Sequence, residues 1–72
     1  MPRFLTLTDV AEILQISSSQ AYALVRSGEL PAIQIGGRGQ WRVEQLMLDQ
    51  YIDNKYAETR RLVEEAKSGK NN

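Results

Sequence analysis

Apolar residues near the start of the chain recur at the period of an α-helix. They occupy positions i, i+3, i+4 and i+7, which gives a helix one buried face: Leu7, Val10, Ala11 and Leu14. Thr6 is a suitable N-cap before this run, and Asp9 is well placed for the helix dipole. We therefore predict a first helix that begins at Leu7.

A second short helix is predicted within residues 16–31, ISSSQAYALVRSGELP. Ser17 and Gln20 have the spacing of a capping box at its start. Gly28 suits a left-handed C-cap at its end, and Pro31 prevents the helix from continuing. The face expected to turn inward holds Ala21, Leu24 and Val25. The face expected to turn outward holds Ser19, Tyr22, Ala23 and Arg26.

The two predicted helices are joined by a tight connection through Gln15 and Ile16. Two short helices joined in this way form a helix-turn-helix, in which the second helix reads DNA. The outer face of the second helix is small and mostly uncharged, which suits the floor of a DNA major groove.

Beyond the second helix the period changes to that of a β-strand. Ile33 and Ile35 point to one side and Gln34 to the other. The glycine-rich residues 36–39 favour a turn, and the residues after them form a returning strand. Because an isolated hairpin is marginal in water, we expect this wing to lean on the helices through Ile33, Ile35 and Trp41.

A long helical segment is predicted from about Glu44 to about Lys67. It has too many apolar residues for one narrow stripe, so we expect one flank to pack on the helix-turn-helix and another to face elsewhere. The apolar residues of this segment are Val43, Leu46, Met47, Leu48, Tyr51, Ile52 and Tyr56. After Tyr56 the apolar residues thin out, and both a short coiled coil and a frayed amphipathic tail fit the pattern.

Composition narrows the possible functions of the 72 residues, which suffice for one small domain. Cysteine and histidine are both absent, which removes thiolate metal sites and the commonest general base. The glycine-rich turn is not followed by the Gly-Lys-Ser/Thr of a nucleotide-phosphate loop. We therefore expect no enzymatic activity, no cofactor and no metal. The absence of a long apolar run predicts a cytoplasmic protein.

Charge gives limited support to a nucleic-acid partner. The formal net charge is zero, whereas DNA-binding domains are commonly basic. Residues 1–43 carry one net positive charge, and three of their arginines lie in or after the second predicted helix: Arg26, Arg38 and Arg42. Residues 44–72 carry one net negative charge.

The order of these elements resembles that of the small excisionase-like, MerR-type winged helix-turn-helix domains of bacteria and phages. The resemblance covers roughly residues 5–53, and its most specific parts are SGELPA (27–32) and WRV (41–43). It implies DNA binding, with the second helix in the major groove and the wing on adjacent backbone or minor groove. Gln20 stands where the family often has threonine, and Ala23 where it often has arginine.

The candidate DNA-binding residues combine the outer helix face with the positions that match the family. On the predicted reading helix they are Ser17, Ser18, Ser19, Gln20, Tyr22 and Arg26; on the wing they are Arg38, Gln40 and Arg42. Several alternatives stay open at this point. Gln20 either reads a base or caps its helix, and Arg42 either contacts DNA or pairs with an acid on the last helix.

The resulting prediction is a mainly α, winged helix-turn-helix protein with a longer C-terminal helix. Its domain is expected at residues 1–56, a helical extension at 57–67 and a disordered tail at 68–72. The expected role is that of a small transcriptional regulator or a recombination directionality factor. Expected partners are double-stranded DNA, a second copy or cooperative array, and a recombinase or RNA polymerase. The alternative is a protein-interaction module that uses the long last helix.

Overall fold

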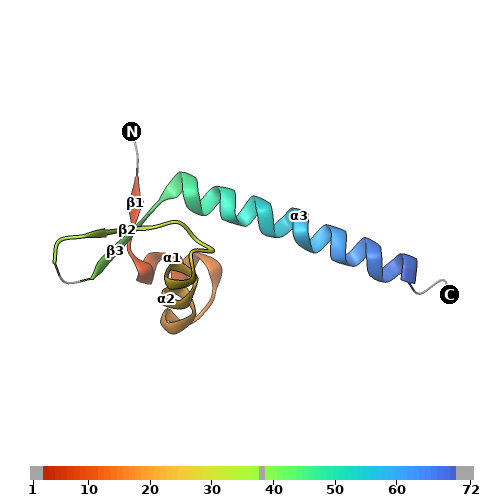
Figure 1. The fold of residues 1–72 in the computed structure, drawn as a ribbon, viewed down its shortest axis with the longest axis horizontal. Helices are drawn as coiled ribbons and strands as arrows, with labels where there is room; N and C mark the ends of the chain where they lie inside the picture. Colours follow the sequence, from red (N-terminus) through yellow and green to blue (C-terminus); the bar gives the residue numbers. More distant parts are fainter. Residues whose placement is uncertain (1–2, 38, 70–72) are drawn as a thin grey trace.

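The computed structural model describes residues 3–37 and 39–69, which form three helices and a small antiparallel sheet (Figure 1). In chain order the elements are β1 (Phe4–Leu5), α1 (Leu7–Leu14), α2 (Ser18–Ser27), β2 (Ile33–Ile35), β3 (Gln40–Glu44) and α3 (Gln45–Gly69). The predicted fold class, mainly α with a wing and a longer C-terminal helix, is confirmed. None of the helices in the described ranges is both long and apolar enough to cross a membrane.

Both short helices begin with reciprocal hydrogen bonds of the capping-box type. The Thr6 hydroxyl accepts the Asp9 backbone N–H at 3.0 Å, and the Asp9 carboxylate accepts the Thr6 N–H at 3.0 Å. Ser17 and Gln20 make the same pair of bonds at the start of α2, at 3.1 and 3.2 Å. These bonds satisfy backbone donors that have no partner inside a helix. The two helix starts predicted from the sequence are confirmed.

The ends of both short helices are left-handed. Gln15 adopts φ 59° after α1 and makes the predicted tight turn, and Gly28 adopts φ 86° after α2. Beyond Gly28 the Leu30 N–H donates to the Leu24 carbonyl at 3.2 Å, which turns the chain back under α2. Leu30 is fully buried there, although it was not among the residues predicted to be buried. An apolar residue just past a glycine C-cap commonly makes this contact, so the signal was present.

The sheet has the strand order β1-β3-β2, and both pairings are antiparallel. The hairpin of β2 and β3 is the predicted wing. Strand β1 was not predicted, because two residues are too few for alternation to be visible. It pairs Phe4 with Glu44 and Leu5 with Val43. The Gln45 N–H also donates to the Arg3 carbonyl at 2.7 Å, so the chain start is tied to the start of α3.

The contact expected between the wing and the helices is wrong for its two isoleucines. Paired residues in antiparallel strands share a face, so Ile33 lies beside Arg42 and Ile35 beside Gln40. Trp41 alternates to the other face and packs against the core. Ile33 and Ile35 are therefore half-exposed, at 50% and 46%. The pairing register decides the face, whatever the apolar content of the strand.

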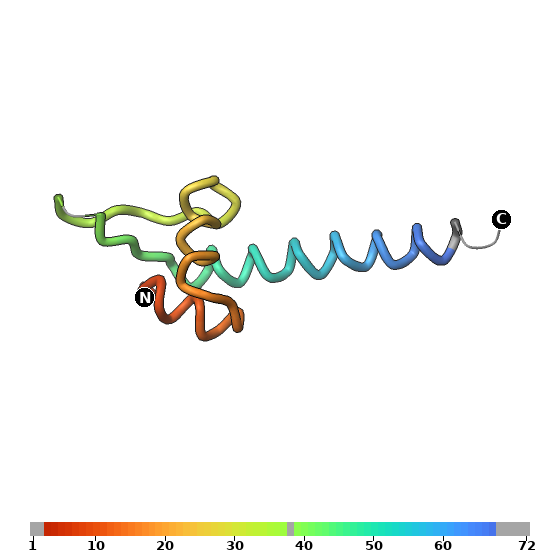
Figure 2. The backbone as a smooth tube through the Cα atoms, turned by 90° about the horizontal axis from the view of Figure 1, so that it is seen from below, coloured from red at the N-terminus to blue at the C-terminus, as the bar shows by residue number. Residues whose placement is uncertain are grey.

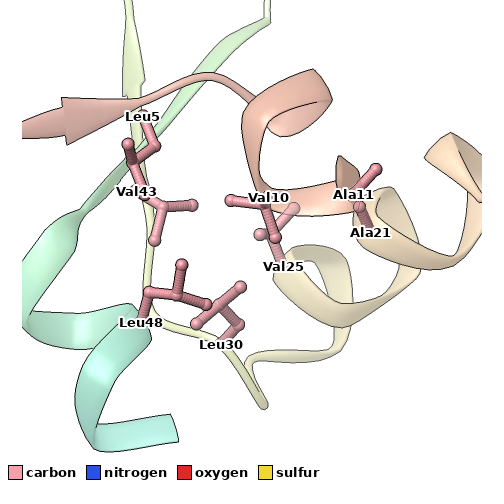
Figure 3. Packing of buried hydrophobic residues seen from close by; sticks show 8 residues of the cluster. All are labelled: Leu5, Val10, Ala11, Ala21, Val25, Leu30, Val43 and Leu48. Atoms are coloured by element: carbon pink, nitrogen blue, oxygen red, sulfur yellow. The ribbon is translucent and has the colours of Figure 1, made fainter. Parts of the chain in front are cut away.

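Eight buried side chains form one apolar core between the sheet and the helices (Figure 3). They come from β1, α1, α2, the loop after α2, β3 and α3. No buried polar side chain is found within the described ranges. The eight residues are Leu5, Val10, Ala11, Ala21, Val25, Leu30, Val43 and Leu48.

Helix α3 belongs to this domain only at its beginning. Leu48 is buried, and Tyr51 and Ile52 pack against the core, whereas every side chain from Tyr56 to Lys67 is exposed. Figures 1 and 2 show α3 and the wing leaving the domain in opposite directions. Residues 68 and 69, expected to be part of a disordered tail, are the last residues of α3, and residues 70–72 lie outside the described part.

Lys55 connects α3 to the loop after α2. Its Nζ lies 3.7 Å from a carboxylate oxygen of Glu29 and 3.2 Å from one of Glu58. The hydrogen bond to Glu58, together with the charge of that carboxylate, raises the pKa of Lys55 above its ordinary value. Lys55 therefore links α3 to the loop after α2 through Glu29.

Candidate nucleic-acid interface

The outer face of α2 is accessible and free of acidic residues. Ala21 and Val25 are buried on the inner side of the helix, as predicted. The four residues expected on the outer side are all exposed: Ser19, Tyr22, Ala23 and Arg26. Because the sequence of α2, SSQAYALVRS, contains no aspartate or glutamate, nothing on the helix itself repels an approaching phosphate.

The N-terminal end of α2 carries the candidate serines. Ser17, Ser18 and Ser19 are all exposed, at the end of a helix where backbone N–H groups favour anions. The Ser17 hydroxyl oxygen accepts the Gln20 N–H and keeps its own proton to donate. The Gln20 side-chain oxygen accepts the Ser17 backbone N–H, so of the two alternatives for Gln20, reading a base or capping its helix, the structure shows the cap. Its amide NH₂ group is the part of this side chain that can still face a ligand.

Tyr22 and Arg26 form a connected pair on the outer face. The Arg26 Nη1 donates to the Tyr22 hydroxyl at 3.0 Å, and the guanidinium carbon lies 5.5 Å from the centre of the tyrosine ring. Both residues were predicted on this face, but their contact with each other was not. Their i, i+4 spacing was the available signal, since it places two side chains side by side on a helix. The tyrosine therefore orients the only charged group on α2.

The wing presents a second group of polar side chains. Gln40 is exposed at the start of β3, opposite Ile35. Arg42 is half-buried, and its Nη1 donates to the Trp41 carbonyl at 2.8 Å. The turn before Gln40 includes Gly39, whose φ of 69° favours glycine. Arg38 lies outside the described residues, so its place on the wing stays a prediction.

Neither arginine of this surface is neutralised by a carboxylate in the part of the chain described. The two ion pairs found over residues 3–37 and 39–69 both belong to Lys55. The alternative in which Arg42 pairs with an acid on the last helix is therefore not observed there. Arg26 and Arg42 are left with guanidinium N–H groups for an external anion. A phosphate or a base edge matches such donors.

A model of the helix-turn-helix domain family matches residues 4–56, which is more than half of the chain. The chain belongs to this helix-turn-helix family. The resemblance to excisionase-like helix-turn-helix domains is thereby confirmed. No curated protein and no solved structure gives a significant match to the chain.

Membership in the family identifies residues 4–56 as a helix-turn-helix DNA-binding domain, a class that is typically non-enzymatic. The match contains the complete core, both short helices and the wing. It ends at Tyr56, from which point the side chains of α3 up to Lys67 are all exposed. The rest of α3 is thus an addition to the family domain.

Proposed function

We propose that this protein binds double-stranded DNA with sequence preference, through the outer face of α2. The observation that carries the proposal is the exposed, acid-free face of α2 with its oriented Tyr22–Arg26 pair. A guanidinium held by a neighbouring hydroxyl loses less conformational freedom when it meets a phosphate or a guanine. The small serines at the helix start allow the backbone to approach the DNA closely.

In the proposed complex, α2 enters the major groove and the wing contacts adjacent backbone or minor groove. The contacts on α2 are assigned to Ser17, Ser18, Ser19, Gln20, Tyr22 and Arg26. Those on the wing are assigned to Arg38, Gln40 and Arg42. Arg26 is the only charge on α2, so the wing arginines supply much of the affinity while α2 sets register and preference.

The biological role proposed is that of a small transcriptional regulator or a recombination directionality factor. In either role the mechanism is equilibrium binding without chemistry, cofactor or metal. Occupancy changes promoter access or bends DNA for a recombinase, with RNA polymerase or the recombinase as protein partner. Such a protein acts in the cytoplasm, at the nucleoid. We assign the DNA-binding domain to residues 1–56, with a helical extension at residues 57–69.

A protein-interaction module is the second candidate function. It is favoured by the exposed apolar side chains on the far part of α3, such as Tyr56 and Leu62. The zero net charge of the chain also agrees with it. In this function the helix-turn-helix serves as a scaffold and α3 is the active surface.

Fluorescence anisotropy with labelled duplex, after selection of bound sequences from a random DNA pool, tests the proposal. The variant Arg26→Ala with Arg38→Ala should lose binding while its far-UV circular dichroism stays unchanged. Arg61→Ala, a single loss of positive charge on α3, is the control and should bind normally. With about three to five phosphate contacts, the log–log salt slope should lie near −3 to −4.

Two results would contradict DNA binding as the function. One is the absence of salt-dependent binding at micromolar protein for the selected sequences. The other is a double variant that binds as tightly as the parent protein, which would favour the interaction module.

A further inference from the structure

Gln34 is a polar residue on the face of the wing that packs, further along, against the core. It pairs with Trp41, and paired residues of antiparallel strands share a face. Trp41 packs against the core, whereas the Gln34 side chain is exposed. Gln34 therefore lies on the helix-facing side of the hairpin, farther out than the core reaches. It was not predicted as a DNA contact, because alternation alone does not show which strand face turns toward the helices.

The helix-facing side of the hairpin is the side from which DNA approaches in the proposed complex. Figure 1 shows α1 and α2 together on one side of the wing. A duplex with α2 in its major groove lies on that side, and the wing then meets the adjacent minor groove. The residues that pair Ile33 and Ile35, Arg42 and Gln40, share the other face of the hairpin. Gln34 is thus the residue of β2 that faces the duplex.

The turn next to Gln34 leaves space for its amide group. A Cβ added to Gly36 or Gly37 would meet no atom within 4 Å, so the surroundings of both glycines are open. At Gly39, where φ is 69°, a Cβ would lie 3.2 Å from the Nε2 atom of Gln34. The amide nitrogen of Gln34 therefore lies beside the turn, at a place that a side chain on residue 39 would crowd. A glycine-rich tip with an amide at its side suits a minor groove, which is about 6 Å wide.

We propose that Gln34 contacts the minor groove beside the site of α2 and selects an A·T pair there. The assignment rests on the proposed function and adds one contact, with its base pair, to those of the wing. The amide N–H groups of Gln34 donate to adenine N3 or thymine O2, which an A·T pair presents in either orientation. A G·C pair places the guanine amino group in the groove, so that a donor meets a donor. Glutamine is among the side chains that proteins use for this distinction.

The contact is uncharged, which separates it from contacts to phosphate. An amide releases no counterion from DNA when it binds. Loss of the Gln34 side chain should therefore lower affinity and leave the log–log salt slope unchanged. Loss of one phosphate contact would change that slope by about 0.9.

Base-pair substitution in the selected duplex tests the assignment. Each A·T pair that flanks the site of α2 is replaced in turn by G·C or by inosine·cytosine. The second pair keeps the minor-groove acceptors of A·T but has the major-groove groups of G·C. Fluorescence anisotropy measures the dissociation constants. At one flanking pair, G·C should raise the dissociation constant of the parent protein at least about fivefold, and inosine·cytosine should change it less than about twofold.

The variant Gln34→Ala should lose this distinction. We expect it to bind the three duplexes within about twofold of one another, at least about fivefold more weakly than the parent binds the A·T duplex. Its salt slope should equal that of the parent. Gln50→Ala removes an exposed glutamine of α3 and is the matched control, which should distinguish the duplexes as the parent does. The far-UV circular dichroism of both variants should be unchanged.

Two results would overturn the assignment while leaving DNA binding in place. One is a parent protein that binds the selected duplex but distinguishes G·C from A·T at none of the flanking pairs. The other is a Gln34→Ala variant that still distinguishes them. A parent protein that binds none of the selected duplexes would contradict the proposed function itself, and the assignment with it.

Discussion

The outer face of α2 depends on a few side chains that hold one another in place. Ser17 and Gln20 close the start of the helix, and Tyr22 holds Arg26 near its end. Ser17 and Gln20 therefore have two roles: they stabilise the helix, and they lie where DNA is proposed to bind. Measuring both the free energy of unfolding and the DNA affinity of the same variants distinguishes these two roles.

Removing the cap should destabilise the protein. Ser17→Ala deletes the acceptor for the Gln20 N–H, and we expect a loss of about 1 kcal/mol in the free energy of unfolding. For a domain of this size that lowers the midpoint of thermal unfolding by about 4–8 °C. Circular dichroism melts measure the change. Ser19→Ala, on the same exposed face, is the control and should melt within a degree or two of the parent; an equal loss in both variants would contradict the role of the cap.

At the scale of the elements, the sheet has one face in the core and one face in solvent. Leu5, Trp41 and Val43 lie on the inner face, whereas Ile33 and Ile35 lie on the outer one. The outer isoleucines leave the wing with an apolar surface that the core does not use. The wing is consequently held to the domain by its central strand and not by β2.

Substitution by threonine should distinguish the two faces of the sheet. Val43→Thr introduces a hydroxyl at a fully buried site and should cost about 1–3 kcal/mol in the free energy of unfolding. Ile35→Thr changes a half-exposed side chain and should stay within about 0.5 kcal/mol of the parent. Urea unfolding measures both values. A larger loss for Ile35→Thr than for Val43→Thr would mean that the strand register is different.

At the scale of the whole molecule, a small domain is joined to a helix that runs past it. The longest dimension of the molecule is 55 Å against 27 and 19 Å for the others. All eight core side chains lie between Leu5 and Leu48, inside the family match. The core of the domain is thus complete without the part of α3 that follows Tyr56.

Truncation after Tyr56 should separate the two parts. Because residues 57–67 contribute no core side chain, the shortened chain should unfold cooperatively, within about 0.5 kcal/mol of the full-length protein. Chemical unfolding monitored by circular dichroism provides both values. Loss of the cooperative transition would show that the part of α3 after Tyr56 belongs to the folding unit, and would contradict a domain boundary at residue 56.

Much of the fold was predictable because its signals are local. The caps at Thr6 and Ser17, the stop at Gly28 and the alternation around Gln34 each depend on residues within one or two turns of each other. The exposed face of α2 followed from the same helical period. The pairing of Tyr22 with Arg26 had a local signal too, in their i, i+4 spacing, although it was not used.

Other features depend on residues far apart in the sequence. The strand β1 exists because Leu5 finds Val43, and the sheet face of Ile33 follows from its pairing with Arg42. Leu30 enters the core because the chain turns back under α2. None of these contacts can be derived from periodicity alone, since a pairing register or a chain direction must be known first.

By itself, the sequence therefore determined where the helices begin and end, which face of α2 is polar and which family the domain resembles. Hydrogen bonds and periodicity within one element are sufficient for those features. Only the tertiary structure decided which face of the wing packs, which residues complete the core and where α3 leaves the domain. Those features depend on the burial of apolar area between elements, which forms only when distant segments meet.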